Sequence, residues 1–340
     1  MCGIAGVITK DKIKLSKEKM TKRNKIFQGL LVAMEDRGGQ SAGVAFIDKG
    51  IIKIAKSPVK ASIFINNKRF KKLLNANYPL IIGHTRLATT GDISKRNAHP
   101  FLRSDIVGVH NGIIYNQESF HKFDYEVDSE IIFDLLARSN NNYKNSFKKL
   151  SGDFAIAWSK IQKDKYELYL VRDGNPLYLA YVKELKTWFY CSTMEALQAV
   201  ILSHYNSIDL KSLPLCKVVT VSQDLKMKKE DVSFKYQSYN YNGRSYAYDD
   251  EDYYSRPSQT FSINDHKVEE AVSQVRDEEN VNDVCSKCGD FIDACRCIFR
   301  CDECFMPIDG EYFLTKDGTV LCTDCNEYQK TSARRYILPD

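Results

Sequence analysis

The sequence predicts an α+β fold for its first 235 residues, and three observations support this prediction. Short apolar segments of strand length recur along this part, with only a few stretches of helical spacing between them. Strands that follow one another without a regular helix between them favour antiparallel sheets over alternating βαβ units. The composition then changes near residue 236 and again near residue 285, which divides the chain into residues 1–235, 236–284 and 285–340.

The expected elements of the first part can be placed in order along the chain. A short buried strand is expected at residues 2–8, and a lysine-rich helix is expected to end near residues 26–34. Another helix is expected over residues 128–138, because Asp128 is a suitable N-cap. The Asn111-Gly112 dipeptide is typical of a two-residue hairpin turn between strands. Further strands are expected at residues 44–47, 51–54, 80–85, 106–110, 113–115, 154–158, 167–171, 177–181, 188–191 and 218–221.

Composition and charge limit the class of protein. With 43% apolar and 27% charged residues, the chain is typical of a globular protein. No apolar stretch approaches the roughly 20 residues of a membrane-spanning helix, and no export signal is found at the start, so a cytoplasmic protein without membrane association is expected. The first 235 residues contain 38 lysines and arginines against 23 aspartates and glutamates, which favours an anionic substrate or partner.

Residues 236–284 have the composition of a linker. They contain 11 acidic against 4 basic residues, many tyrosines, asparagines and serines, and little apolar material. Such a segment cannot bury enough apolar surface to fold alone, so a disordered acidic, tyrosine-rich linker is expected. Stacking of its tyrosines on a partner is the alternative.

The last segment is rich in cysteine. Eight of the eleven cysteines lie between residues 285 and 325. Cys301-x-x-Cys304 and Cys322-x-x-Cys325 are separated by 17 residues and match a four-thiolate zinc ribbon, whose connecting hairpin would turn at Asp317-Gly318. A second zinc site is expected from Cys285, Cys288, Cys295 and Cys297; the alternative is one site with spare thiols.

The expected zinc module is a structural unit. A zinc ion bound by four thiolates has no open position for water, so metal catalysis is not expected here. Residues 285–340 contain 7 basic against 10 acidic residues, which disfavours binding to nucleic acid because phosphate contacts need a basic face. Docking to a protein is the expected role.

Cys2 directly follows the initiator methionine. Because its side chain is small, removal of Met1 is expected to leave one residue that carries both a thiol and a free α-amine. The unperturbed pKa values are about 8.5 and about 7.7 to 8.0, so near neutral pH the amine can accept the proton of the thiol. His84, His99 and His110 are therefore expected to pack and to form hydrogen bonds rather than to act as bases. Taken alone, Cys2 could equally be a small buried apolar residue.

Six motifs appear in order along the first part of the chain. They are Met1-Cys-Gly-Ile-Ala-Gly6, Arg37-Gly-Gly-Gln-Ser-Ala-Gly43, Gly83-His-Thr-Arg-Leu-Ala-Thr-Thr-Gly91, Asn97-Ala-His-Pro100, Val109-His-Asn-Gly-Ile-Ile114 and Val127-Asp-Ser-Glu130. Over roughly residues 2 to 225 the chain resembles the glutaminase domain of class II glutamine amidotransferases, close to that of the glucosamine-6-phosphate synthases. The resemblance implies a four-layer αββα sandwich of the N-terminal-nucleophile (Ntn) hydrolase type. It also implies hydrolysis of L-glutamine to glutamate and ammonia through a thioester of the N-terminal cysteine.

The resemblance assigns three residues to recognition of the substrate. Arg86, with Thr89, would hold the α-carboxylate of glutamine, for which a guanidinium is well suited because it can bind both oxygens. Asp128 would hold the α-ammonium. The simpler interpretations are a surface charge for Arg86 and a helix cap for Asp128.

The resemblance also assigns the catalytic groups beside Cys2. The side-chain amide of Asn111 and the backbone N–H of Gly112 would stabilise the oxyanion of the tetrahedral intermediate, and Arg37 would orient the N-terminal turn. Leu87 and Thr90 stand where the aminosugar synthases have tryptophan and histidine. Neither position supplies the nucleophile or an oxyanion donor, so hydrolysis should persist, whereas coupling to the chemistry of those synthases is put in doubt.

Three functions remain open from the sequence. The first is a glutaminase that passes ammonia to an acceptor enzyme on a separate chain, because no segment after residue 235 is long enough for an acceptor domain. The second is a catalytically idle scaffold with a zinc docking module. The third is an Ntn amidohydrolase that acts on another amide. The intact nucleophile argues against an idle scaffold. The expected binding of both the α-carboxylate and the α-ammonium of a free amino acid argues against another amide as substrate.

Overall fold

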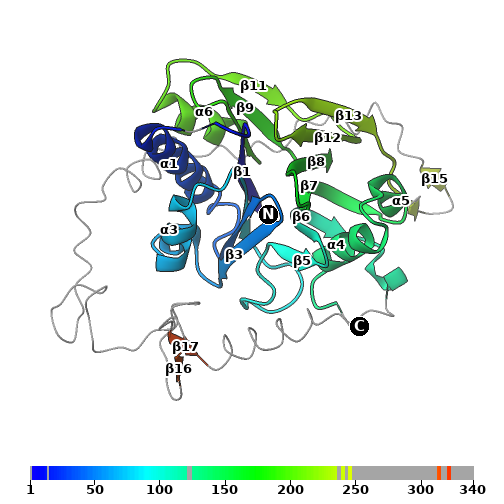
Figure 1. Cartoon of the computed structure of the whole chain (residues 1–340). Coiled ribbons are helices and arrows are strands. Elements are labelled where there is room, and N and C mark those ends of the chain that lie inside the picture. The colour runs from blue at the N-terminus through cyan, green and yellow to red at the C-terminus, as the bar shows by residue number, and fades with distance from the viewer. Residues whose placement is uncertain are drawn as a thin grey trace.

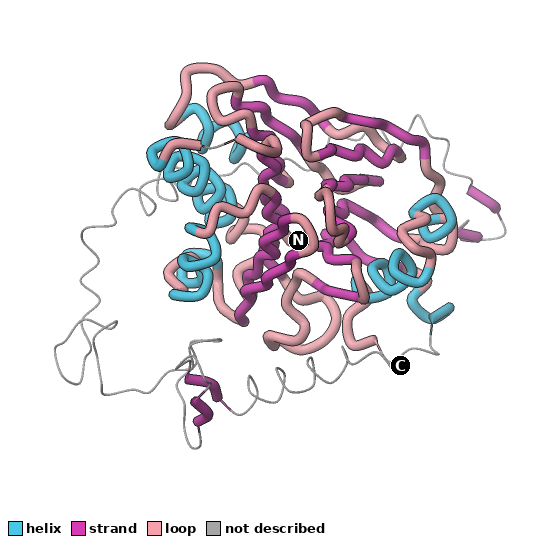
Figure 2. The backbone as a smooth tube through the Cα atoms, viewed as in Figure 1, coloured by secondary structure: helices cyan, strands magenta, loops and turns pink. Residues whose placement is uncertain are grey.

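Two antiparallel sheets lie face to face at the centre of the molecule. The computed structural model describes residues 2–13, 15–120 and 125–235, and beyond them only the backbone of four short strands. Helices cover the outer side of each sheet, so the order of layers is helices, sheet, sheet, helices (Figures 1 and 2). The expectation of antiparallel strands with few helices between them is confirmed.

The first sheet has seven strands. They are β1 (Gly3–Thr9), β2 (Ser41–Asp48), β3 (Ile51–Ser57), β4 (Leu80–Arg86), β9 (Tyr178–Val182), β10 (Thr187–Cys191) and β11 (Asp209–Ser212). Their order is β11-β9-β10-β1-β4-β2-β3, so the strand that follows Cys2 lies in the middle of the sheet. Its neighbours are β10 and β4.

The second sheet has six strands. They are β5 (Phe101–Arg103), β6 (Ile106–Ile114), β7 (Gly152–Lys160), β8 (Glu167–Asp173), β12 (Lys217–Ser222) and β13 (Met227–Asp231), in the order β13-β12-β8-β7-β6-β5. The central pairing of β6 with β7 runs without interruption from Ile106 opposite Lys160 to Ile114 opposite Gly152.

The helices form the two outer layers. The layer on the seven-stranded sheet contains α1 (Lys17–Ala33), α2 (Ala61–Phe64), α3 (Lys68–Asn75) and α6 (Met194–Leu202) (Figure 1). The layer on the six-stranded sheet contains α4 (Ser129–Arg138) and α5 (Tyr143–Phe147), and a 3-10 turn, η1 (Gln117–Phe120), precedes α4. No helix in residues 2–13, 15–120 or 125–235 is long and apolar enough to cross a lipid bilayer.

Three hydrophobic clusters separate the four layers. One lies between α1 and the seven-stranded sheet, one between the two sheets, and one between α4 and the six-stranded sheet. Alternate residues of β1 enter different clusters, since Ala5 and Val7 face the helices whereas Ile4 and Ile8 face the other sheet. A strand buried on both faces needs apolar residues at every position, which explains the uninterrupted apolar run after Cys2.

The strands that the sequence predicted are present, whereas several short elements were missed. The missed elements among residues 2–235 are η1, α2, α3, α5, α6, β5, β11 and β13. Strands β11 and β13 lie at sheet edges and contain few buried residues. An edge strand with little buried surface carries no alternation of apolar and polar residues, so its sequence resembles a loop.

The hairpin turn predicted at Asn111-Gly112 is wrong. Strand β6 continues through both residues, and they pair with Ala155 and Phe154 of β7. Gly112 has a φ of +138°, and a Cβ there would lie 1.7 Å from the carbonyl oxygen of Asp153. Glycine is therefore required by close approach of the neighbouring strand and by an unusual backbone angle, and not by a turn.

Two strand pairs lie beyond residue 235. Within the expected linker, β14 (Tyr239–Tyr241) pairs with β15 (Arg244–Tyr246). The intervening Asn242-Gly243 is a typical hairpin sequence that the linker interpretation overlooked. Within the cysteine-rich segment, β16 (Tyr312–Leu314) pairs with β17 (Val320–Cys322), in agreement with the predicted connecting hairpin. The remainder of residues 236–340, including the other seven cysteines of the predicted zinc module, lies outside the described residues.

Candidate active site

Cys2 lies at the start of the central strand, with its thiol against the chain that leaves β4. The Leu87 backbone N–H points to Cys2 Sγ at 3.3 Å, and Sγ lies 3.4 Å from the Leu87 carbonyl oxygen. Arg37 Nε donates to the carbonyl oxygen of Cys2 at 2.9 Å. The residue after Arg37 is Gly38, where a Cβ would lie 2.6 Å from the carbonyl carbon of Arg86. The loop that follows α1 therefore packs directly on the site and holds the N-terminal turn.

The surroundings of Cys2 determine the charge of its thiol. Burial, the largest effect, raises the pKa of the thiol. The Leu87 N–H and the guanidinium of Arg86 lower it, and the carboxylate of Asp128 raises it. The residue is thus close enough to Arg86 and Asp128 to respond to both charges. A thiol with a raised pKa is mostly protonated at neutral pH, so its use as a nucleophile requires a base beside it.

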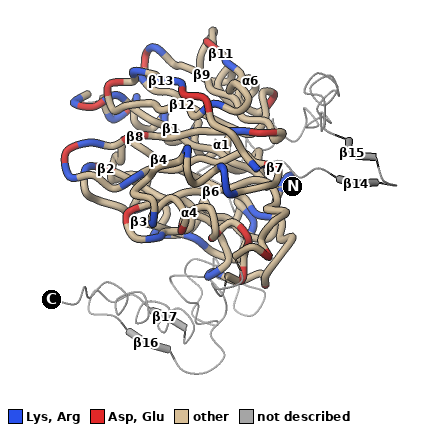
Figure 3. Tube along the Cα trace, turned by 90° about the vertical axis from the view of Figure 1, so that its right-hand side faces the viewer, with Lys and Arg blue, Asp and Glu red and all other residues tan. Residues whose placement is uncertain are grey.

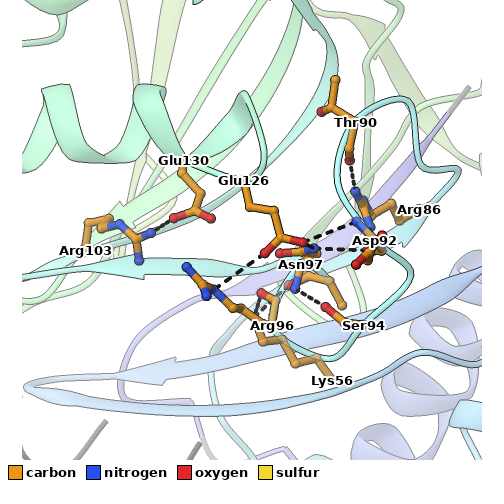
Figure 4. A network of polar contacts seen from close by, with 11 residues as sticks. Lys56, Arg86, Thr90, Asp92, Ser94, Arg96, Asn97, Arg103, Glu126 and Glu130 are labelled. Atoms are coloured by element: carbon orange, nitrogen blue, oxygen red, sulfur yellow. Dashed lines mark hydrogen bonds and ion pairs between the residues drawn. The ribbon is translucent and has the colours of Figure 1, made fainter. Parts of the chain in front are cut away.

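Arg86 ends β4 and holds the loop that follows. Its Nη1 donates to the carbonyl oxygen of Asp92 at 3.0 Å, and its Nη2 donates to that of Thr90 (Figure 4). Two of the five N–H donors of the guanidinium are used in this way, which leaves donors for a ligand. Thr89 lies in the same loop with its side chain exposed. The structure therefore brings Arg86 to the site and leaves Thr89 at the surface of the loop.

The carboxylate of Glu126 also fixes the loop that Arg86 holds. Glu126 accepts hydrogen bonds from the side chain of Asn97 and from the backbone N–H of Asp92, and the Asn97 side chain also donates to the Asp92 carbonyl oxygen at 3.1 Å (Figure 4). The hydrogen bond from Asn97, the largest effect, lowers the pKa of Glu126. Because Glu126 lies two residues before Asp128, one network connects the loop held by Arg86 to the start of α4. Sequence analysis missed Glu126, although Asn97 lies in one of the motifs.

Asp128 caps α4, as the sequence predicted. One carboxylate oxygen accepts from the Ser129 backbone N–H at 2.8 Å, and the other accepts from the Ile114 backbone N–H at 2.8 Å. The side chain is 5% exposed. The Ser129 hydroxyl also donates to the first of these oxygens at 3.4 Å. The oxygen that accepts from Ile114 keeps a further lone pair, which is compatible with an additional cationic ligand. The capping interpretation is confirmed, and the recognition role stays a prediction.

Asn111 and Gly112 enter the site from the other sheet. The Asn111 side chain is buried, and its Nδ2 donates to Ser192 Oγ at 2.9 Å. Ser192 Oγ also accepts from the backbone N–H of Ile4, at 2.9 Å. The amide is thereby connected to the strand that begins at Cys2. Sequence analysis missed Ser192, since a single serine after a strand carries no recognisable pattern.

Three histidines pack between the sheets behind the site. The rings of His84 and His99 lie 4.0 Å apart, and His84 Nε2 is 3.1 Å from the carbonyl oxygen of His110. His110 Nδ1 lies 2.9 Å from Ser129 Oγ. Burial lowers the pKa of His84 to about 3, and it lowers the pKa values of His99 and His110 too. This agrees with the expectation of packing and hydrogen bonding.

A buried lysine borders this histidine cluster. Lys56 Nζ donates to the carbonyl oxygens of Arg96, Ala98 and Pro100 at 3.1, 2.7 and 3.4 Å. Burial lowers the pKa of Lys56 to about 7. The three carbonyl dipoles favour the charged ammonium, so the lysine supports the loop that leads from the site to β5.

The buried histidines should make stability depend on pH. The folded chain keeps them neutral, whereas the unfolded chain takes up protons below a pKa of about 6.5, so stability is present above that pH and is lost as the pH falls. We expect the free energy of unfolding to decrease by about 2 kcal/mol per buried histidine between pH 7 and pH 5. For the variant His99→Leu, urea unfolding at the two pH values should show a decrease that is smaller by about this amount.

The matched control for this prediction is His204→Gln, because His204 follows α6 on the far side of the seven-stranded sheet from the cluster. It should leave the pH dependence as it is in the unmodified chain. An unchanged pH dependence in His99→Leu would show that His99 does not stay neutral in the folded protein.

The described residues contain no metal centre. Within residues 2–13, 15–120 and 125–235, no three histidine, cysteine, aspartate or glutamate side chains are grouped as metal ligands. The predicted zinc ligands Cys285, Cys288, Cys295, Cys297, Cys301, Cys304 and Cys325 lie outside the described part, and Cys322 is described only as backbone of β17.

A family model matches the middle part of the chain. Residues 84–199 match a model described as a glutamine amidotransferase domain. The matched residues begin within β4 and include Arg86, Asn111, Gly112, Asp128 and Ser192.

Curated proteins match a longer part of the chain. A glutamine–fructose-6-phosphate aminotransferase (isomerizing) of Buchnera aphidicola is 32% identical over 195 residues, which covers 52% of this chain and 30% of that protein. The protein of the same name from Helicobacter pylori is 30% identical over 246 residues, which covers 66% of this chain and 38% of that protein. The chain thus spans about a third of the length of these relatives.

Solved structures share the fold. Glutamine phosphoribosylpyrophosphate amidotransferase from B. subtilis, complexed with ADP and GMP, superposes with a TM-score of 0.54 at 20% identity, covering 68% of this chain and 49% of that chain. A structure described as the allosteric regulatory enzyme of purine biosynthesis superposes with a TM-score of 0.53 and the same coverage. Residues 84–199 therefore match a glutamine amidotransferase domain, and the chain has a mixed α and β fold similar to those of these two structures.

Proposed function

We propose that the class II glutamine amidotransferase domain of this chain hydrolyses L-glutamine through Cys2, with Met1 removed. The observation that carries the proposal is the position of the Cys2 thiol, which contacts the Leu87 N–H directly after Arg86. Asp128 is held to the end of β6 by the Ile114 N–H, two residues after Gly112. A free amino acid has a carboxylate and an ammonium at fixed separation, and a guanidinium and a carboxylate beside one nucleophile are suited to binding both. Thr89 is proposed to help Arg86 bind the α-carboxylate of glutamine when its loop moves towards the ligand.

The proposed reaction has two covalent steps. Cys2 Sγ attacks the side-chain amide carbon of glutamine, the α-amine takes the thiol proton, and the amide oxygen becomes an oxyanion facing Asn111 and Gly112. The C–N bond then breaks, and the leaving nitrogen takes the proton from the amine to depart as ammonia. Water attacks the resulting thioester, the C–S bond breaks, and glutamate is released with the thiol restored.

Arg37 and the bond to Leu87 support this chemistry by fixing the nucleophile. The carbonyl of Cys2 is held by Arg37, and the thiol is held between the N–H and C=O groups of Leu87. Because the Cys2 thiol is already held in place, little conformational entropy is lost when it attacks the substrate.

The test of this function is an assay of the 340-residue chain after intact mass has confirmed the loss of Met1. Glutamate and ammonia should appear in equal amounts from L-glutamine. Glutaramic acid, which lacks the α-amine, and asparagine, whose side chain is one methylene shorter, should react at least 100-fold more slowly. Equal rates on these amides would support an amidohydrolase of broader specificity. No product from correctly processed chain, with or without candidate acceptors, would support the scaffold alternative.

We further propose that ammonia passes to an acceptor enzyme on a separate chain, in the cytoplasm. The segment from 236 to 340 is acidic, tyrosine-rich and cysteine-rich, which is the composition of a linker and a docking module. The excess of basic residues in the first 235 residues favours an anionic acceptor, and lysines and arginines occur on several separate elements (Figure 3).

We propose that the cysteine pairs of residues 285–340 hold structural zinc, with Cys301, Cys304, Cys322 and Cys325 at one site. The pairing of β16 with β17, in which Tyr312 lies opposite Cys322, supports this proposal, because a zinc ribbon needs a hairpin that leads into its second C-x-x-C motif. Purified chain should contain one or two zinc ions per molecule by inductively coupled plasma mass spectrometry. Cys301→Ser with Cys304→Ser should lose one of them, and the same content in both proteins would contradict the assignment.

A further inference from the structure

Ser192 lies at a junction between the two sheets, outside the residues to which a role has been assigned. It follows β10 directly and has no solvent exposure. Its backbone N–H donates to the Ile4 carbonyl oxygen at 3.0 Å, and its Oγ accepts from the Ile4 N–H at 2.9 Å and from Asn111 Nδ2 at 2.9 Å. One hydroxyl thus connects β1 of the first sheet to β6 of the second.

The two connected strands carry the proposed nucleophile and the proposed oxyanion donor. Ile4 is two residues from Cys2 along the same extended segment, and Asn111 is the donor itself. A hydroxyl oxygen has two lone pairs, and in Ser192 the two N–H groups occupy both. The distance between the two strands is therefore set in part by this side chain.

The bond also orients the amide. The two N–H bonds of a carboxamide lie in one plane at about 120° to each other, so anchoring one of them to Ser192 Oγ fixes the direction of the other. The Asn111 side chain also lies within hydrogen-bonding reach of the buried His84 ring. The bond to Ser192 holds the amide through its nitrogen, which is the atom that would donate to an oxyanion.

We infer that Ser192 is a positioning residue, which holds the Asn111 amide so that its second N–H points at the oxyanion formed on Cys2. This inference rests on the proposed glutaminase function. Ser192 does not touch the substrate. Its effect is exerted through Asn111, so it should influence the transition state more than the binding of glutamine.

The first test compares Ser192→Ala with the unmodified chain. We expect kcat for glutamate release to fall by about 10- to 100-fold, with KM for glutamine within about twofold, at a temperature at which both proteins are folded by circular dichroism. Ser192→Thr keeps the acceptor oxygen and should recover most of kcat. The matched control is Ser159→Ala, since Ser159 on β7 is also fully buried but its hydroxyl has no partner among the described residues.

The deciding measurement is a double-mutant cycle with Asn111. In the Asn111→Ala background, Ser192→Ala should change kcat by less than about twofold, because the group that it positions has been removed. If Ser192 served only to stabilise the fold, kcat would fall by the same factor in both backgrounds, and this result would overturn the inference. A kcat for Ser192→Thr that is as low as that of Ser192→Ala would overturn it as well.

The outcomes separate this inference from the proposed function. If the unmodified chain releases no glutamate although Met1 is absent, the glutaminase proposal fails. If it is active and Ser192→Ala matches it in kcat, the positioning role alone fails. If Ser192→Ala does not fold, the cycle is measured with Ser192→Cys, whose loss of kcat should disappear in the Asn111→Ala background.

Discussion

Replacing Cys2 by alanine is expected to reduce glutamate release on the order of 10⁴- to 10⁶-fold, as is typical when a covalent nucleophile is removed. The neighbouring groups cannot compensate, since Arg86 and Asp128 supply charge but no free nucleophile. Binding of glutamine should persist, because the groups proposed to recognise it are unchanged. Glutamate release and the dissociation constant for glutamine, from isothermal titration calorimetry, measure these two effects separately.

Two comparisons show whether the thiol alone accounts for the effect. Cys216→Ala removes another partly buried thiol, which lies 3.7 Å from an Asp173 carboxylate oxygen, and activity should stay within about twofold of the unmodified chain. A chain with a non-removable extension before Cys2 keeps the thiol but has no free α-amine, and it should be as inactive as Cys2→Ala. Activity in the extended chain would mean that another group acts as the base.

Replacing Asn111 by alanine is expected to lower kcat about 10²- to 10³-fold, which corresponds to about 3 to 4 kcal/mol of transition-state stabilisation. The backbone N–H of Gly112 would remain as the second donor, so activity should not disappear. KM should change little, because an oxyanion forms only after the substrate has bound. The variant Asn111→Asp, which keeps the shape but loses both N–H donors, should be at least as impaired.

The control for Asn111 is a second buried asparagine near the end of β6. Asn116 Nδ2 donates to the Lys149 carbonyl oxygen at 2.8 Å, and its Oδ1 accepts from the Ser151 N–H at 2.9 Å. Asn116→Ala should lower the free energy of unfolding and leave kcat within a few-fold. If both variants lost kcat equally, the loss in Asn111→Ala would reflect the fold, and the oxyanion role would be contradicted.

Much of the architecture could be predicted because its signals are local. The buried run after Cys2 and the helix capped by Asp128 each express a periodicity or a cap within a few residues. Edge strands such as β13 could not be found, since few of their residues are buried. Asn111-Gly112 misled the prediction because the same dipeptide that suits a turn also suits a strand pressed against its neighbour.

Some residues of the candidate site could be predicted from the sequence, and others could not. Cys2, Arg37, Arg86, Asn111, Gly112 and Asp128 could be proposed from motifs in the sequence, and the structure brings their elements together between the two sheets. Glu126 and Ser192 could not be proposed. Their importance comes from partners far away in the chain, as when Ser192 bonds to a strand 188 residues earlier and to an asparagine 81 residues earlier.

The sequence by itself determined the residue types at the candidate site and the buried central strand, because periodicity and motif spacing are properties of the linear chain. The tertiary structure decided which donors face the thiol, which carboxylate fixes the loop after Arg86, and that β6 runs straight through Asn111 and Gly112. These features depend on hydrogen bonds and close packing between segments that lie far apart in the chain. Such contacts form only when the layers are assembled, and no short segment of sequence encodes them.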